Sequence, residues 1–243
     1  MRGPADTAAA AHVFVEGLAD ELRITGADGH HLQRVRRLST GERVTAADGS
    51  GAWRLYEIVA ADAAALRLAA REPIEYSVAP SMGVALAVGL TKRGLEDVVT
   101  AVTELGVTAV TPVRSERTVV RWDAARSERA IARLQLAARE ASMQARRVRV
   151  PVIEPVLAVG ELAGRPGLVV ADRVGVAPAE LAVPSPPGWT VLVGPEGGLS
   201  AAELRSLEPF ERVALGPNVL RAGTAPIAAV ALLADRARVL PAE

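Results

Sequence analysis

From about Met82 onward the chain alternates between short apolar runs and helical patterns, and this alternation constrains the fold more than any other feature. Strands that are covered on both faces of a sheet have nearly continuous apolar sequences. The runs GVALAVGL, VTAVTPV, GLVVAD and TVLVG fit that description. Helical patterns separate them, including GLEDVVTAVTELG, a charged segment from Asp123 to Arg147, and an Ala-rich segment from Thr224 to about Leu240. The order predicts an α/β domain with a mostly parallel sheet.

The first 75 residues have a different rhythm, with short alternating segments close together. HVFVEG, ERVTAAD, AWRLYEIVA and ALRLAAREP read as strands, and HHLQRVRRL reads as a short helix. Gly49 and Gly51 suit a hairpin connection, while Pro73 and Pro80 bracket an expected linker. We therefore predict a small β-barrel domain over residues 1–75 and an α/β domain over residues 76–243.

Composition excludes several classes of site. The 243 residues carry 28 Lys and Arg against 28 Asp and Glu, so no uniformly basic coat for nucleic acid is present. The chain has no cysteine, which excludes disulfides and thiolate chemistry, and its three histidines, His12, His30 and His31, all lie near the start. We expect no metal site. No membrane span or signal sequence is evident, so cytoplasm is the expected location and no membrane partner is expected.

The stretch VLVGPEGGLSAAELRSL ends an apolar strand in glycines and starts a helix at once. Ser200 and Glu203 have the spacing of a capping box, which predicts the helix start. Ligands of parallel α/β sheets bind beyond the carboxyl ends of strands, and glycine lets a ligand approach the backbone there. The stretch is neither G-x-G-x-x-G nor a P-loop. A tight turn without a ligand is the alternative interpretation.

A second junction, VALGPNVLRAGTAPIAA, repeats the arrangement. It passes from a strand through Gly216 and Arg221 to a helix beginning near Thr224, and Pro226 suits the first helical turn. Two glycine-bearing loops after neighbouring strands predict one pocket lined by backbone.

Together, LVGPEGGLSAAEL and ALGPNVLRAGTA resemble the SPOUT (trefoil-knot) methyltransferases, and within them the RsmE family of 16S ribosomal RNA (uracil-N3)-methyltransferases. HHLQRVRRLSTGE, LTKRGLEDVVTAVTELGVTAVTPVRSERTVV and REASMQARRVRVP resemble further family segments in the right order. The chain departs from the family pattern at Ala101, Met143 and Gly223. The resemblance spans essentially the whole chain.

The resemblance implies a C-terminal knot domain that binds S-adenosylmethionine and an N-terminal PUA-like β-barrel that helps to bind RNA. It also implies a homodimer whose partner is 16S rRNA, within the small ribosomal subunit. The residues that it implies for the cofactor lie on the two glycine loops and their flanks: Leu192, Gly194, Pro195, Glu196, Gly197, Gly198, Leu215, Gly216, Val219, Leu220, Arg221, Thr224 and Ala225.

Methylation of uracil N3 requires a neutral imide to lose its proton, so the enzyme must stabilise a developing anion. A fixed guanidinium suits that charge. Arg221 is the first candidate and Arg117 the second. Glu196 is a candidate general base, with orientation of the loop backbone as the alternative role.

Basic residues that could hold RNA phosphates lie in three places, and a solvated charged face is the alternative for each. They are Arg34, Arg36 and Arg37; Lys92 and Arg93; and a helix-end cluster of Arg139, Arg146, Arg147 and Arg149. Two other functions stay open at this point. One is ribose 2′-O-methylation by the same superfamily, and the other is an RNA-binding protein whose knot has lost catalysis.

Overall fold

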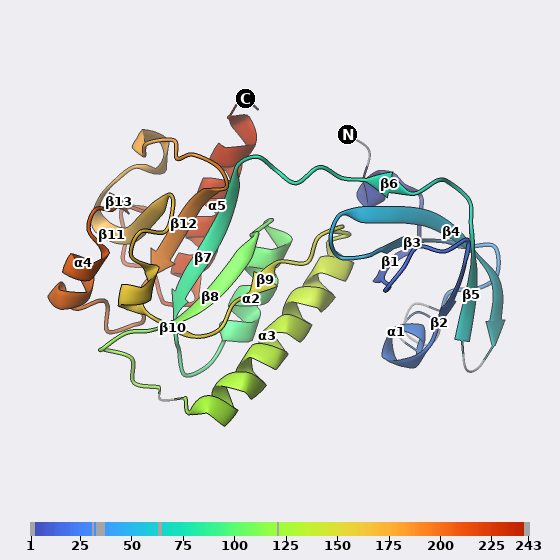
Figure 1. Ribbon diagram of the computed structural model, residues 1–243, viewed down its shortest axis with the longest axis horizontal. Helices are drawn as coiled ribbons and strands as arrows, with labels where there is room; N and C mark the ends of the chain where they lie inside the picture. Colours follow the sequence, from blue (N-terminus) through green and yellow to red (C-terminus); the bar gives the residue numbers. More distant parts are fainter. Residues whose placement is uncertain (1–2, 31, 33–36, 63–64, 121, 241–243) are drawn as a thin grey trace. The chain divides into compact units, whose positions relative to one another are not determined.

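The chain forms two compact units in the computed structural model, which describes residues 3–30, 32, 37–62, 65–120 and 122–240 (Figure 1). Unit 1 comprises Met1–Ala79 and Ser142–Val150, and unit 2 comprises Pro80–Ala141 and Pro151–Glu243. Unit 1 is thus built from two separate stretches of chain. We call Ser142–Val150 the return segment. The division at residues 75 and 76 stays a prediction.

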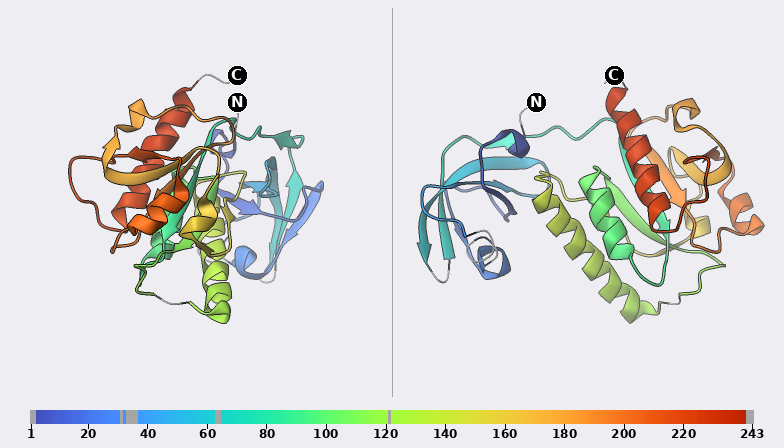
Figure 2. Two further views of the ribbon diagram at one scale, coloured as in Figure 1. Left: turned by 60° about the vertical axis from the view of Figure 1, so that its left-hand side comes forward. Right: turned by 180° about the vertical axis from the view of Figure 1, so that it is seen from behind.

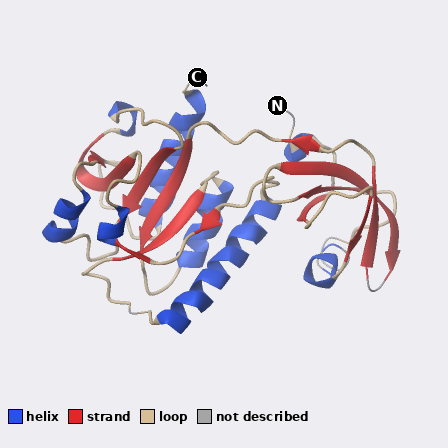
Figure 3. Ribbon diagram, viewed as in Figure 1, coloured by secondary structure: helices blue, strands red, loops and turns tan. Residues whose placement is uncertain are grey.

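Unit 1 is a β-rich unit around a single sheet (Figure 3). Its elements are η1 (Pro4–Asp6), β1 (Ala11–Phe14), β2 (Glu21–Ile24), α1 (Gly26–His30), β3 (Arg43–Ala47), β4 (Ala52–Asp62), β5 (Ala65–Ala70) and β6 (Glu75–Tyr76). The strand order is β1-β3-β4-β5-β2, with β6 also paired to β4. Tyr56, Ile58, Leu66 and Leu68 are fully buried, because alternate residues of β4 and β5 face the core.

The return segment completes a second, smaller core of unit 1. Its apolar side chains pack against Phe14, Ala47 and Trp53; they are Met143, Val148 and Val150. Val150 also pairs through its backbone, since its N–H donates to Gly49 O at 3.1 Å. The end of the long helix therefore contributes both apolar surface and backbone pairing to the N-terminal sheet.

Unit 2 has the alternating helices and strands that the sequence predicts. Its elements are β7 (Gly83–Gly89), α2 (Leu95–Glu104), β8 (Ala109–Arg114), α3 (Ala124–Gln144), β9 (Val152–Ile153), β10 (Leu157–Ala158), η3 (Val159–Leu162), β11 (Leu168–Val176), η4 (Pro178–Glu180), β12 (Gly188–Val193), α4 (Ala201–Leu207), β13 (Glu211–Val213) and α5 (Thr224–Val239). The last residues of α3 belong to unit 1.

The sheet of unit 2 has the order β10-β8-β7-β12-β11-β13, with β9 also paired to β8. Every pairing between these strands in the described part of the chain is parallel. η3 and α4 cover one face through Leu162 and Leu207, which pack against Leu192 of the sheet. α5 contacts β7, β12 and α2, and Figure 2 shows α2 and α5 in front of the strands in the view from behind. The predicted fold class is confirmed.

Candidate active site

The loop after β12 turns sharply between the strand and α4. Gly198 has a φ of +71°, a left-handed conformation that favours glycine. The helix starts as predicted, because Ser200 Oγ accepts from Glu203 N at 3.1 Å and Glu203 Oε2 accepts from Ser200 N at 2.7 Å. Pro195 is buried against β7, where a Cβ on Gly89 would overlap the Pro195 backbone nitrogen. Gly89 of β7 thus permits the loop after β12 to lie close to this strand.

The loop after β13 is held at its far end by α5. The carbonyl oxygen of Arg221 accepts hydrogen bonds from Thr224 N and Ala225 N, both at 2.9 Å. Gly216 has a φ of +150°, and a Cβ there would meet no atom within 4 Å. The backbone of this loop is therefore held by hydrogen bonds at residue 221, and the space beside residue 216 is unoccupied by other protein atoms.

A cavity of about 310 Å³ lies between the two loops, at the carboxyl ends of β11 and β12. Apolar side chains and loop backbone line most of it. The residues that form its wall are Val170, Ala171, Asp172, Arg173, Val193, Gly194, Pro195, Gly198, Leu199, Leu204, Leu215, Gly216, Asn218, Val219, Leu220 and Ala225. This is the edge of the sheet at which a parallel α/β fold binds ligands.

The structure brings most of the predicted cofactor residues to this cavity. Those in its wall are Gly194, Pro195, Gly198, Leu215, Gly216, Val219, Leu220 and Ala225. Leu192, Glu196, Gly197, Arg221 and Thr224 are not part of the wall. Leu192 is fully buried in the core that the sheet forms with η3 and α4. The cofactor role of all these residues stays a prediction.

Asp172 is a wall residue that the sequence interpretation missed. It forms an ion pair with Arg212, and its Oδ1 accepts from Val174 N at 3.3 Å. The available signal was the final residue of GLVVAD, a carboxylate that directly follows the apolar run of a parallel strand. Asn218 and Leu199 were missed as well, although both lie inside the two quoted loops.

The loop after β8 packs against the loop after β12 and holds it in place. Arg117 Nη1 donates to Gly197 O at 3.2 Å, and Ser115 Oγ donates to Gly198 O at 3.4 Å. Glu203, which is 8% exposed, accepts from Glu116 N through Oε1 at 2.7 Å. A Cβ on Gly197 would lie 3.1 Å from both Cβ and O of Arg117. Gly197 therefore serves the contact between the two loops.

The other two predicted catalytic residues have exposed side chains. Arg221 and Glu196 each lack a side-chain hydrogen bond or ion pair in the part of the chain that the structure describes. Arg117 differs, because its guanidinium is engaged with Gly197. Within the described residues, no group of three or more His, Asp or Glu side chains is arranged to hold a metal ion.

The predicted RNA-binding residues are in several environments. Arg34 and Arg36 lie outside the described residues, whereas Arg37, Lys92 and Arg93 are exposed. Arg139 is half-buried on α3. Burial lowers the pKa of Arg147 to about 10, so its guanidinium is poorly hydrated.

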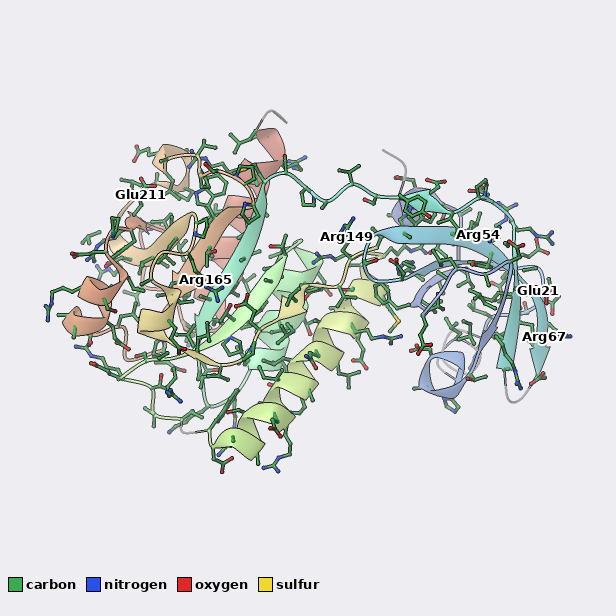
Figure 4. All side chains as sticks on the ribbon, viewed as in Figure 1. Glu21, Arg54, Arg67, Arg149, Arg165 and Glu211 are labelled. Carbon is green, nitrogen blue, oxygen red and sulfur yellow. The ribbon has the colours of Figure 1, made fainter. Side chains whose placement is uncertain are left out.

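Two further arginines of the helix-end cluster are bound to the backbone of unit 1. Arg146 Nη2 donates to Ala9 O at 2.6 Å. Arg149, labelled in Figure 4, donates to Ser50 O and, at 2.7 Å, to Ser77 O. These two guanidinium groups already have acceptors within the fold, and the RNA-binding role of the cluster stays a prediction.

No helix in the described part of the chain has the length and apolar character needed to cross a bilayer.

Two protein families match the chain, in two separate regions. Residues 79–234 match a family described as RNA methyltransferase domain. Residues 24–68 match a family described as RNA methyltransferase PUA domain. The first match alone covers more than half of the chain.

Curated relatives and solved structures agree with these matches. Ribosomal RNA small subunit methyltransferase E of Mycobacterium bovis is 34% identical over 223 residues, covering 86% of this chain and 83% of the relative. The Bacillus subtilis protein of that name is 30% identical over 237 residues, covering 91% and 93%. A structure of the Neisseria gonorrhoeae protein of that name, bound to S-adenosyl methionine, superposes with a TM-score of 0.80 at 25% identity, covering 91% of this chain and 95% of that one.

Proposed function

The chain belongs to the ribosomal RNA small subunit methyltransferase E (RsmE) family, and from that premise we propose that it methylates N3 of a uridine in 16S rRNA, using S-adenosylmethionine. The observation that carries the proposal is the cavity between the two glycine loops, at the carboxyl edge of a parallel sheet. Its volume, about 310 Å³, falls within the range of roughly 300–1,000 Å³ that small-molecule sites occupy.

The wall of the cavity fits S-adenosylmethionine chemically. Leu199, Leu215 and Leu220 offer apolar surface for an adenine ring, and the glycine loops offer backbone groups for its polar edge. Asp172 offers a carboxylate that can accept from hydroxyl or ammonium groups. When bound, the cofactor supplies a methyl group carried on a cationic sulfonium.

The residues of this chain then act on the uracil. The N3 proton must leave, and the negative charge that develops spreads to the two carbonyl oxygens of the ring. Arg221 stabilises that charge, because its backbone is fixed by α5 while its guanidinium is free of partners among the described residues. Arg117 positions the β12 loop through Gly197 O. Glu196, exposed on that same loop, is the candidate acceptor of the proton.

Unit 1 supplies the PUA-like RNA-binding part, approximately the predicted domain 1–75, and unit 2 supplies the methyltransferase domain. The enzyme acts in the cytoplasm as a homodimer, on 16S rRNA within the small ribosomal subunit. Support for self-association comes from α5, on which Leu232 is 40% exposed and Val239 is 69% exposed. Light scattering should give twice the chain mass of 25.3 kDa, and a value near that mass at micromolar concentrations would contradict the homodimer.

Nucleoside mass spectrometry of 16S rRNA from a deletion strain tests the proposed reaction. We expect one N3-methyluridine to disappear, and to return when the wild-type gene is restored. The Arg221→Ala gene should restore protein but little of the modified nucleoside. Loss of a ribose-methylated nucleoside instead would identify 2′-O-methylation, and no change in any nucleoside would favour an RNA-binding protein without this activity.

A further inference from the structure

Unit 2 has a second cavity, of about 640 Å³, on the other side of α4 from the cavity described above. It lies beyond the carboxyl ends of β8 and β10, and is closed by the first turns of α4 and η3. Leu204 faces the first cavity, whereas Ala202 and Ser206 face the second. The two cavities therefore use opposite faces of one short helix.

Trp122 gives the second cavity an aromatic side chain. The other two tryptophans, Trp53 and Trp189, are 1% exposed and belong to the cores of their units. Trp122 is half-buried and forms part of the cavity wall. An indole that is half-exposed in a cavity offers one face for stacking, and every nucleobase has a face that can stack on it.

Arg114 gives the same cavity a cation. It is the last residue of β8, and its exposed side chain has no hydrogen bond or ion pair in the described part of the chain. Two residues after Arg114, the carboxylate of Glu116 adds an acceptor for base N–H groups. An aromatic face, a guanidinium and a carboxylate in one cavity match the three parts of a nucleotide contact: base stacking, phosphate and base edge. An inorganic phosphate ion would be repelled by the carboxylate of Glu116 and could not stack on the indole of Trp122.

The wall of the second cavity is bonded directly to the loop of the first. Glu116 N donates to Glu203 Oε1 at 2.7 Å, and Glu203 Oε2 accepts from Ser200 N at 2.7 Å. Ser115 Oγ reaches Gly198 O at 3.4 Å, and Gly198 is in the wall of the first cavity. A ligand in the second cavity is thus held against the same loops that shape the first.

We propose that this second cavity binds a single-stranded nucleotide of the RNA substrate, stacked on Trp122 with its phosphate toward Arg114. The proposal rests on the proposed function, since it assigns part of the contact with RNA to unit 2. It adds a nucleotide site that is separate from the methyl-donor cavity. Because stacking tolerates any base, the site adds affinity for unpaired RNA more than it adds sequence selection.

The direct test is tryptophan fluorescence of the full chain during titration with hexauridylate. Quenching should be saturable, absent with inorganic phosphate, and lost in Trp122→Phe, since the two remaining indoles are buried. Fluorescence anisotropy with labelled hexauridylate should show Trp122→Ala weakened roughly tenfold and Trp122→Phe close to wild type. Arg114→Gln should weaken binding and reduce its salt dependence, and Arg129→Gln serves as an exposed control in the same unit.

Methylation kinetics separate this proposal from the proposed function. Trp122→Ala and Arg114→Gln should raise the KM for 16S rRNA while the Kd for S-adenosylmethionine stays within twofold of wild type. If the wild type methylates N3 and both folded variants match it in KM and hexauridylate affinity, the nucleotide site is wrong and the function stands. If the wild type binds hexauridylate through Trp122 but forms no N3-methyluridine, the function is wrong and the site stands.

Discussion

The return segment of unit 1 and the glycine loops of unit 2 use arginine in opposite ways. In the return segment, Arg146 and Arg149 donate to backbone carbonyls, and burial lowers the pKa of Arg147. In the loop after β13, Arg221 is exposed and has no side-chain partner among the described residues. A guanidinium that is bonded to backbone carbonyls within the protein contributes to the fold, whereas one without a partner can stabilise charge on a substrate. Substitutions should therefore separate stability from chemistry between the two regions.

The largest expected effect is at Arg221. Arg221→Ala should lower the single-turnover methylation rate by about 10²–10³-fold, as the loss of one preorganised donor typically does. Affinity for S-adenosylmethionine should stay within a few-fold, because like charge gives the guanidinium nothing to gain from the sulfonium in the ground state. Rapid-quench kinetics beside calorimetry measures both quantities. A collapse in affinity with a normal rate at saturation would make Arg221 a binding residue instead.

His12 makes the stability of unit 1 depend on pH, which tests the contacts of the return segment. Burial, assisted by the neighbouring charge of Arg146, lowers the pKa of His12 from 6.5 to about 4, while its Nε2 donates to Arg147 O at 2.9 Å. The folded form thus binds this proton less readily than the unfolded chain does. The stability that neutral His12 contributes is fully present above pH 6.5 and is lost as pH falls toward 4, by about 3 kcal/mol.

Urea unfolding between pH 4.5 and 7.5 should show this loss in the wild type and a shallower dependence in His12→Gln. His30→Gln, at an exposed position, is the matched control and should retain the wild-type slope. Equal slopes in all three proteins would show that the two states bind the His12 proton equally.

Arg146→Ala should cost about 1.5–3 kcal/mol of stability, the usual value of a hydrogen bond to a charged group. The reason is that Ala9 O would lose a donor at 2.6 Å in a part-buried contact. Its matched partner is Arg221→Ala, which should leave the unfolding midpoint almost unchanged. The comparison between regions fails if Arg221→Ala destabilises the protein as much as Arg146→Ala does.

The smallest effect is expected at Gly197. A Cβ there would press on Cβ and O of Arg117 at 3.1 Å, so the neighbouring loop must shift by a few tenths of an ångström. Gly197→Ala should cost about 1 kcal/mol and change S-adenosylmethionine affinity little, since Gly197 is absent from the cavity wall. Gly198→Ala, at a wall position with a φ of +71°, should weaken binding more. Calorimetry of the two variants compares them, and a stronger loss at Gly197 would contradict this order.

The long elements of both units could be predicted from the sequence because they repeat a pattern several times. β7 and β12 are continuous apolar runs, and Leu95, Val98, Val99 and Val102 of α2, which recur at helical spacing in GLEDVVTAVTELG, are buried. Leu105, which continues that spacing, is 39% exposed because the helix ends at Glu104. β6, β9 and β10 were missed, since two residues are too few to show a period, and the four-residue β2 was missed as well.

The site was predictable to the extent that it depends on backbone. Gly194, Gly198 and Gly216 indicate the loops that line the cavity, because glycine permits backbone conformations and close approaches that other residues disfavour. Asp172 was not identified, since its place in the cavity wall depends on how neighbouring strands pair. The hydrogen bonds of Arg146 and Arg149 to backbone carbonyl oxygens could not be predicted, because a charged sequence does not reveal which acceptors lie nearby in the fold. Most of the predicted helix HHLQRVRRL lies outside the described residues, so it stays a prediction.

The two-part construction of unit 1 has a consequence for synthesis on the ribosome. Its sheet is encoded in the first 79 residues, yet Met143, Val148 and Val150 cover Phe14 and Trp53 only after the chain has reached residue 150. The apolar surface of the nascent N-terminal sheet therefore stays uncovered while β7, α2, β8 and α3 are synthesised. At about 5–20 residues per second, synthesis of this stretch takes several seconds. The N-terminal unit is thus begun first, but its second core is incomplete until the first stretch of unit 2, Pro80–Ala141, has been synthesised.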